Sequence, residues 1–310
     1  MFYYVVKMLI VPLILYWIIA YFPFKSRISW YIHAFFTSAY TFMILFINDW
    51  TEISYYLRPV CILLFVCSLL RKMIFLRSIK PGRLNKTTKI FIALYGLLAM
   101  YQCLISILII ITYMESVPKQ KEAVDLMFPL KGGLYEVVNG GMNSSMNYHF
   151  SYRSLKYAVD ITKLTPLGSR KERFGTMDPL TSYPVYNDSV YSPVDGRIVE
   201  VMDGIDDNVP NVLGGNAANM VIINYKDYDI LLLHLKKNSL LVKKDDFVRA
   251  GQELAKVGNS GYSSEPHLHI HAIRHDNSSD YFNGTSVPIT FHGIYLKRND
   301  LLLDQTLIFR

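Results

Sequence analysis

The hydrophobic pattern divides the chain into two halves. Up to residue 114, apolar residues form long stretches, whereas after residue 132 they form short runs separated by turn residues. A bilayer span needs about 20 helical residues, and the stretches of adequate length are 8–24, 30–47, 53–70 and 90–114. They show almost no polar face, which disfavours a soluble bundle of buried helices. The pattern therefore predicts a membrane α-helical N-terminal half, residues 1–114, with about four transmembrane helices.

Two of these stretches need comment. The third carries Arg58 near one end, which we interpret as an arginine that reaches the membrane interface. The first could be a cleaved signal peptide, but it lacks a small-residue cleavage site and three more apolar stretches follow, which favours a retained helix.

Charge predicts the orientation of these helices. The formal net charge is +7, and much of the excess lies in the run 71–89, between the third and fourth stretches. Lys25 and Arg27 lie between the first two stretches, whereas Asp49 and Glu52 lie between the second and third. Because positive loops stay inside, we expect a multi-pass protein of a bacterial cell membrane, with the N-terminus and the C-terminal domain outside the cytoplasm. The basic run is thus read as a lipid-facing loop; no basic-aromatic array suggests nucleic-acid binding.

The second half predicts a β domain. Residues 115–131 are polar at first and contain Pro118, which indicates a linker to a domain at 132–310. The three cysteines all lie in the apolar stretches, so this domain has neither disulfides nor thiolate ligands. Turn residues separate short β-like runs, which predicts an all-β antiparallel sheet. The expected strands are 157–162, 197–202, 220–225, 229–235, 253–257 and 267–273.

Three alternating histidines suggest a metal site. In a strand, His267, His269 and His271 would project from one face. Neutral imidazoles on one face suit a zinc ion. The alternative is a set of incidental histidines on a solvated strand.

Three upstream residues are further candidates. His149 follows Asn147-Tyr148, and Asp160 lies in an apolar strand, where a lone carboxylate is costly unless it is paired or coordinated. Asp160 could instead cap a turn. His234 ends an apolar run, and a lone histidine there is more often a hydrogen-bonded core residue than a catalyst.

Several motifs in order carry a family resemblance. They are Tyr-Ser-Pro-Val-Asp-Gly-Arg-Ile-Val at 191–199, Leu-His-Leu at 233–235, Val-Arg-Ala-Gly-Gln at 248–252, and Gly-Asn-Ser-Gly at 258–261 followed by Pro-His-Leu-His at 266–269. In this order and spacing the chain resembles the lysostaphin-like M23 family of zinc endopeptidases, from about residue 132 to 291. The membrane half takes no part in the resemblance.

The resemblance implies a role for each matching residue. His269 and Asp160 correspond to zinc ligands, and His234 and His267 to the catalytic histidines. The family's usual remaining ligand lies four residues before the aspartate, where this chain has Lys156, which cannot bind zinc while it is protonated. We expect His149, eleven residues before Asp160, to be the third ligand. His271 matches no family ligand.

The function implied is zinc-dependent hydrolysis of peptide bonds in bacterial cell-wall peptidoglycan by a membrane-anchored metalloendopeptidase. The expected cofactor is Zn²⁺, and the expected partners are the peptidoglycan peptide and the lipid bilayer. Protein partners in the membrane, such as those of the division machinery, stay open. Two alternatives remain: an inactive M23-like domain that binds the wall or activates another hydrolase, and an enzyme that cuts a non-wall peptide.

Overall fold

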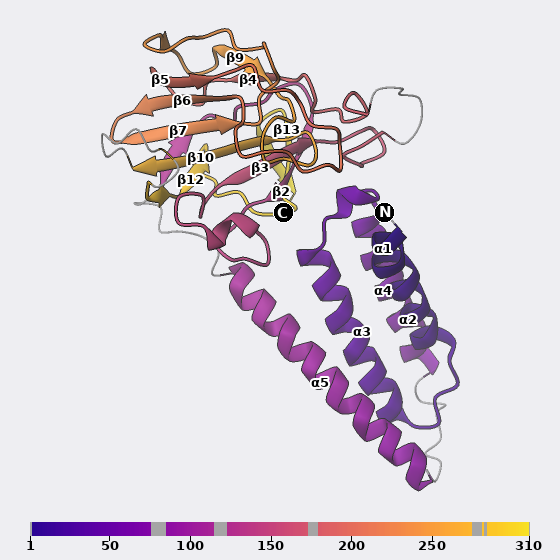
Figure 1. Ribbon diagram of the computed structural model, residues 1–310. Coiled ribbons are helices and arrows are strands. Elements are labelled where there is room, and N and C mark those ends of the chain that lie inside the picture. Colours follow the sequence, from indigo (N-terminus) through magenta and orange to yellow (C-terminus); the bar gives the residue numbers. More distant parts are fainter. Residues whose placement is uncertain are drawn as a thin grey trace. The chain divides into compact units, whose positions relative to one another are not determined.

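The computed structural model forms two compact units, Met1–Thr112 and Tyr113–Arg310 (Figure 1). It describes residues 2–75, 85–114, 123–172, 179–274, 281 and 284–309, without the side chains of 112–114. Of the expected basic run 71–89 and the expected linker 115–131, residues 76–84 and 115–122 therefore lie outside the described residues.

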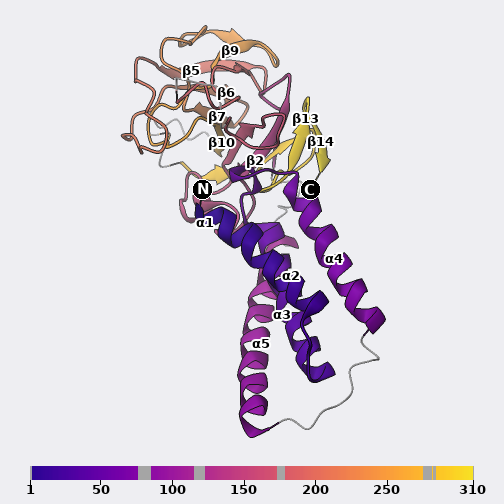
Figure 2. The same ribbon diagram turned by 90° about the vertical axis from the view of Figure 1, so that its right-hand side faces the viewer.

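The N-terminal unit is helical. A first helix runs through α1 (Phe2–Val5), a π-helical turn (Val6–Ile10) and α2 (Val11–Tyr21). It is followed by α3 (Arg27–Ile47), a 3₁₀ turn (Trp50–Glu52), α4 (Leu57–Phe75) and α5 (Lys86–Met114). Ser26 caps α3 because its side chain accepts a hydrogen bond from the Ser29 N–H. In Figures 1 and 2, α3 and α5 begin at the end of the unit where α2 and α4 finish.

Three helical segments, Phe2–Tyr21, Arg27–Ile47 and Lys86–Ile111, are long and apolar enough to cross a membrane. Our expectation of about four spans is therefore one more than the described residues support. The predicted span at 53–70 does form most of α4, but α4 carries Arg58, Arg71 and Lys72. Its uncharged part, residues 59–70, would reach about 18 Å at 1.5 Å per residue, against a hydrocarbon core of about 30 Å.

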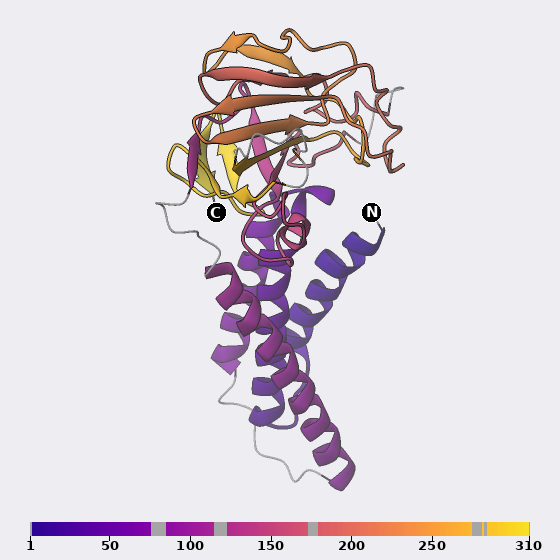
Figure 3. The ribbon, with the colours of Figure 1, turned by 60° about the vertical axis from the view of Figure 1, so that its left-hand side comes forward.

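The second unit is a β domain built on a ten-stranded sheet, as the short β-like runs between turn residues predicted. Its main path runs in the order β14-β13-β2-β3-β10-β7-β6-β5-β8, and β11 pairs with β10. All pairs in this sheet are antiparallel; the separate pair β1–β12 is parallel. Figure 3 shows β5, β6, β7 and β10 lying side by side. The strands are β1 (Val124–Leu126), β2 (Leu134–Asn139), β3 (Val159–Lys163), β4 (Ser189–Tyr191), β5 (Gly196–Met202), β6 (Met220–Tyr225), β7 (Tyr228–Leu233), β8 (Phe247–Val248), β9 (Glu253–Lys256), β10 (Leu268–Arg274), β11 (Ser286–Val287), β12 (Ile289–Phe291), β13 (Leu301–Leu303) and β14 (Thr306–Phe309).

Alternation along the central strands gives this unit its own core. Val221, Ile223, Ile230 and Leu232 face a large buried cluster that also contains Ile270. The intervening residues of the same strands form a second cluster on the opposite face, with Met220, Ile222, Leu231, Leu233 and Ile273. Burial on both faces explains why these strands read as nearly continuous apolar runs. A separate core also means that this unit can be studied as an isolated segment.

Candidate active site and metal centre

The sheet places Asp160 and His269 opposite each other. β3 and β10 are antiparallel neighbours, and His269 pairs with Asp160 in their register. The Nδ1 atom of His269 lies 2.8 Å from Oδ1 of Asp160. Both residues are almost completely buried, with exposed fractions of 2% and 1%. Backbone pairing therefore fixes two of the three predicted ligands with respect to each other.

His149 reaches the same carboxylate from a loop. It lies in a 3₁₀ turn (Tyr148–Ser151), and its Nε2 is 3.0 Å from Oδ2 of Asp160. Asn147 caps this turn and also donates side-chain hydrogen bonds to the carbonyls of Lys156 and Ala158, at 3.4 and 3.0 Å. These bonds tie the two ends of the spacer together, so the eleven-residue separation still brings His149 to Asp160.

Lys156, which occupies the family's usual ligand position, points elsewhere. Its Nζ lies 4.7 Å from the centre of the Phe150 ring and 5.5 Å from that of Tyr157. His149, Asp160 and His269 instead offer three ligand atoms within 4.8 Å of one another.

His234 and His267 lie beside this group with their rings oriented by backbone carbonyls. The ring centres of the two residues are 4.7 Å apart. Nδ1 of His234 is 2.8 Å from the Ser260 carbonyl, and Nδ1 of His267 is 2.8 Å from the Glu265 carbonyl. Since a carbonyl only accepts, each Nδ1 carries the proton and each neutral ring keeps a free lone pair on Nε2. Nε2 of His267 lies 3.7 Å from Oδ1 of Asp160.

The Gly-Asn-Ser-Gly turn at 258–261 positions His234. His234 itself has a left-handed backbone with φ of 62°, a conformation that is uncommon for residues other than glycine and concentrates at functional sites. The N–H of Gly258 donates to the His234 carbonyl at 3.0 Å. A Cβ atom on Gly258 would lie 2.5 Å from the Lys236 backbone, so the turn can approach His234 only with glycine at this position.

Sequence reasoning missed two contacts to the site. Nδ1 of His271 lies 3.0 Å from Nε2 of His269, on the ring edge away from Asp160. Asn139 donates from Nδ2 to Oδ2 of Asp160 at 3.0 Å. The shared strand face had brought His271 forward as a candidate, but nothing in the sequence pointed to Asn139, which reaches the site through the β2–β3 pairing.

Burial disfavours the charged form of three site imidazoles, whereas neighbouring imidazoles favour the charged form of the Asp160 carboxylate. Burial alone would raise the pKa of Asp160, but the imidazoles of His149 and His267 outweigh it and hold this pKa well below its usual range. Burial lowers the pKa of His269 to about 4. It also lowers the pKa values of His234 and His271 well below the ordinary value. Neutral imidazoles and an ionised carboxylate are the forms that bind a metal ion.

An open cleft of about 430 Å³ leads to the group. His149, His234 and His269 line its floor, and Tyr148, Tyr152 and Tyr262 are among its other lining residues. The three tyrosines are exposed by 46%, 59% and 56%, so their rings are available to a bound chain. A peptide can therefore reach the buried histidines from solvent.

Comparisons with known proteins identify a family for the second unit. Residues 182–281 match the model of Peptidase family M23. Over 75 residues, 24% of this chain, the sequence is 32% identical to lipoprotein NlpD of Yersinia enterocolitica and spans 67% of that protein. The chain belongs to peptidase family M23. The matched M23 region contains His234, His267, His269 and His271, whereas His149 and Asp160 precede it.

Other matches cover smaller shares of the matched proteins. Over 72 residues the chain is 32% identical to an uncharacterised metalloprotease of Haemophilus influenzae, and the match covers 23% of this chain and 15% of that protein. Among solved structures, a zinc-containing peptidase from Vibrio cholerae aligns with 55% of this chain and 37% of its own, at 19% identity and a TM-score of 0.30.

Proposed function

We propose that the Tyr113–Arg310 unit is an active zinc-dependent endopeptidase that cuts peptide bonds in bacterial peptidoglycan. The observation that carries this proposal is the buried group of His149, Asp160 and His269, with His234 and His267 beside it. An open cleft lined by His149, His234 and His269 leads to this group. Membership of peptidase family M23 supports the substrate class.

The donor set fits a zinc ion. Two imidazole nitrogens and one carboxylate are ligands that zinc accepts, and three protein ligands are typical of catalytic sites, which keep a further position open. The ion-pair partners of Asp160 among the described residues are histidines, not lysine or arginine. We therefore assign His149, Asp160 and His269 as the residues that would hold the metal. When bound, zinc supplies a Lewis acid that makes water more acidic and polarises a carbonyl group.

The two remaining histidines would carry the proton transfers. In the neutral form of each ring, Nε2 is the unprotonated nitrogen because the Nδ1–H is held by a backbone carbonyl. One of them takes a proton from the attacking water, whose oxygen forms the new bond to the carbonyl carbon. The C–N bond then breaks, and the leaving nitrogen receives a proton from an imidazolium. The depressed pKa of His234 favours rapid return of its proton.

Two residues would position the ligands. With Nδ1 of His269 used for the metal, its Nε2–H donates to Nδ1 of His271, which fixes the ring orientation and tautomer. Asn139 donates to Oδ2 of Asp160 and so fixes the orientation of this carboxylate. Neither would touch substrate.

Digestion of purified sacculi tests the proposal. The segment 113–310 should release free amino groups from sacculi, and chelation should abolish this release. The His269→Ala variant is the matched control. Retained zinc without any release of amino groups would instead favour a domain that binds the wall or activates another hydrolase. Hydrolysis that continues in excess chelator would refute the zinc mechanism.

We also propose that this domain lies outside the cytoplasm. α5 is apolar enough to span the membrane, and Lys86 and Lys89 mark its first turns. Positive residues stay inside, so the chain after Met114 would emerge on the outer side. Protease added to intact protoplasts should remove the domain and leave the basic run 71–89 protected. Cleavage in this run with a protected C-terminal domain would show the opposite orientation, in which the domain could not contact the cell wall.

A further inference from the structure

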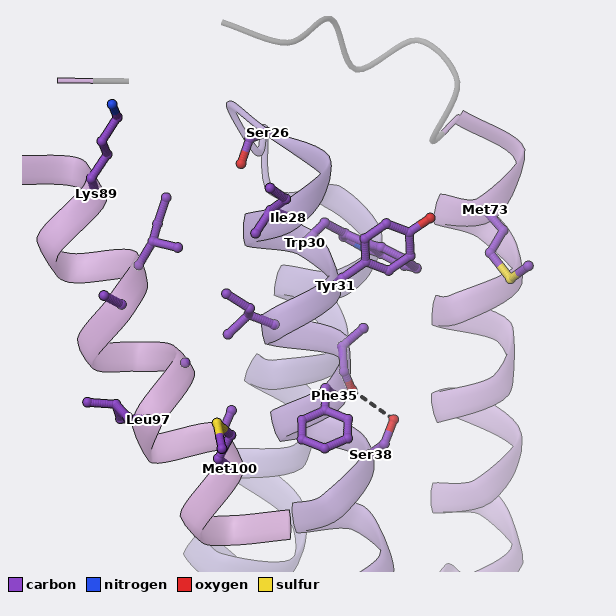
Figure 4. Close-up of a pocket in the computed structure, with 16 residues that line it drawn as sticks. Ser26, Ile28, Trp30, Tyr31, Phe35, Ser38, Met73, Lys89, Leu97 and Met100 are labelled. Carbon is purple, nitrogen blue, oxygen red and sulfur yellow. Dashed lines mark hydrogen bonds between the residues drawn. The ribbon is translucent and has the colours of Figure 1, made fainter. Parts of the chain in front are cut away.

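The helical unit carries an apolar groove on α3. Its volume is about 1180 Å³, and its lining comes from α3 and α5, with Met73 from α4. Figure 4 shows α3 between the other two helices, with Leu97 and Met100 on α5 and Phe35 on α3. Small residues create this space, since Ala93, Gly96 and Ala99 of α5 stand where larger side chains would fill it.

Hydrocarbon is the ligand chemistry that this lining fits. Ile28, Phe35, Leu97 and Met100 line the groove, and both α3 and α5 are segments apolar enough to lie in a bilayer. The volume exceeds the roughly 300–1,000 Å³ of typical small-molecule pockets. The groove can therefore take long acyl chains along α3.

One end of the groove is cationic. Lys89 and the N-cap Ser26 line this end, where α3 and α5 both begin (Figure 4). Lys86 lies in the same first turn of α5 as Lys89, and no side-chain partner of Lys89 occurs in the described part of the chain. The N-termini of two helices add partial positive charge.

Two further cations lie on α4, and neither has a carboxylate partner among the described residues. Lys72 donates from Nζ to the Phe22 carbonyl at 3.0 Å, and the Arg71 guanidinium lies 4.3 Å from the centre of the Tyr21 ring. The acidic residues in the sequence of residues 1–112 are Asp49 and Glu52, which follow the opposite end of α3. The groove thus combines an apolar body with one positive end.

We propose that this groove binds an anionic phospholipid, with the phosphate at Lys89 and Ser26 and an acyl chain along α3. Basic pockets between membrane helices on the cytoplasmic side bind anionic headgroups. A second copy of this chain is a poorer occupant, because side-by-side pairing at this end would bring lysines together with no acid between them. A zwitterionic lipid also carries a phosphate, but the cation of its own headgroup offsets that charge, so the positive end favours a lipid with a net negative charge.

Tryptophan quenching by brominated lipids tests the proposal, because Trp30 lines the groove. The full chain with Trp17→Phe, which lacks a tryptophan that is 57% exposed, would be reconstituted in phosphatidylcholine vesicles. Of the two tryptophans that remain, Trp30 lines the groove and is 4% exposed, whereas Trp50 is fully buried and does not line it. Dibromostearoyl phosphatidylglycerol and dibromostearoyl phosphatidylcholine are then compared as quenchers at equal low fractions. We expect phosphatidylglycerol to quench Trp30 at several-fold lower concentration.

Lys89→Gln should remove about fivefold of this preference, since one lysine near an anionic headgroup contributes about 1 kcal/mol. The matched control is Lys7→Gln, because Lys7 is bonded to Asn48 at the other end of α3. A Cβ on Gly96 would lie 3.7 Å from Ile32, an ordinary contact distance. Gly96→Leu should therefore be accommodated, and its side chain should fill the groove and block quenching by both lipids.

Three outcomes would overturn the proposal. Equal quenching by both lipids would mean that bulk lipid fills the groove. No quenching by either lipid, in a chain whose helical circular dichroism is intact, would mean that no acyl chain reaches Trp30 in the groove. A preference that survives Lys89→Gln but falls with Lys7→Gln would place the phosphate elsewhere.

Discussion

Replacement of His149 by alanine examines the least expected feature of the site, a ligand on a long spacer. In the metal-free domain the change removes the contact between Nε2 of His149 and Oδ2 of Asp160, at 3.0 Å. A hydrogen bond to a charged group contributes about 1.5–3 kcal/mol, so the free energy of unfolding should fall by about 2 kcal/mol. Asn139 and His269 still bond to the carboxylate, so the domain should fold.

The effect on zinc affinity should be larger. Loss of a residue that only orients a ligand costs about 10–100-fold in metal affinity, so loss of a direct ligand should exceed about 100-fold. Competition with a chromophoric chelator measures this affinity, and sacculus digestion measures the accompanying loss of activity. Lys156→Ala is the control and should leave zinc binding unchanged, because the ammonium group lies over the Phe150 ring.

The double variant His149→Ala, Lys156→His sharpens the test. It should not restore zinc binding, since the side chain at position 156 extends toward the rings of Phe150 and Tyr157. Wild-type zinc affinity in His149→Ala would show that we chose the wrong ligand. Rescue by histidine at position 156 would show that the spacer can rearrange to the family's usual pattern.

Three further predictions concern the histidines of the site. His234→Ala and His267→Ala should each keep zinc and lose turnover, whereas His269→Ala should lose both. Metal analysis beside the digestion assay checks this. Zinc release from His267→Ala but not from His269→Ala would make His267, not His269, the ligand on this strand. His271→Leu should weaken zinc binding about 10–100-fold, and His271→Gln, which keeps an acceptor for Nε2–H of His269, should weaken it less; equal affinity in both variants and wild type would remove its positioning role. Burial lowers the pKa of His269 to about 4 from an ordinary value of about 6.5. Between these two pH values the unfolded chain binds a proton that the folded chain does not. The metal-free domain should therefore lose stability as pH falls from about 6.5 to about 4, by at most about 1.4 kcal/mol per pH unit for this residue. Urea unfolding in chelator measures this slope, and stability that is flat or rises toward pH 4 would contradict it.

Short apolar runs between turn residues predicted much of the sheet, because the central strands are buried on both faces. The expected strand at 220–225 matches β6, and the expected strand at 229–235 covers most of β7. The run at 267–273 likewise corresponds to β10. The parallel pairing of β1 with β12 was not predictable, since the two strands are short and lie far apart in the sequence.

The membrane half shows where composition alone misleads. The stretch at 53–70 is apolar on average, yet Arg58 at one end and Arg71 beyond the other limit the length that can stay in hydrocarbon. The Arg58 guanidinium donates to the Tyr55 hydroxyl at 2.9 Å and is buried. Only the folded arrangement reveals that partner.

The candidate site was predictable in its residue types more than in its contacts. Alternation along a strand placed His269 and His271 on one face, and the cost of a lone buried carboxylate singled out Asp160. The approach of His149 depends on Asn147, whose side chain closes the spacer by bonding to Lys156 and Ala158 carbonyls. Such loop closure has no periodic signal in sequence.

Titration of zinc into the metal-free segment 113–310, with amino-group release from sacculi as the readout, tests the central claim most directly. Activity should rise from zero to a plateau at one zinc per chain, and the new amino termini should map to peptide bonds of peptidoglycan. His269→Ala should stay inactive at every zinc concentration. One zinc bound per wild-type chain with no amino group released would contradict the account.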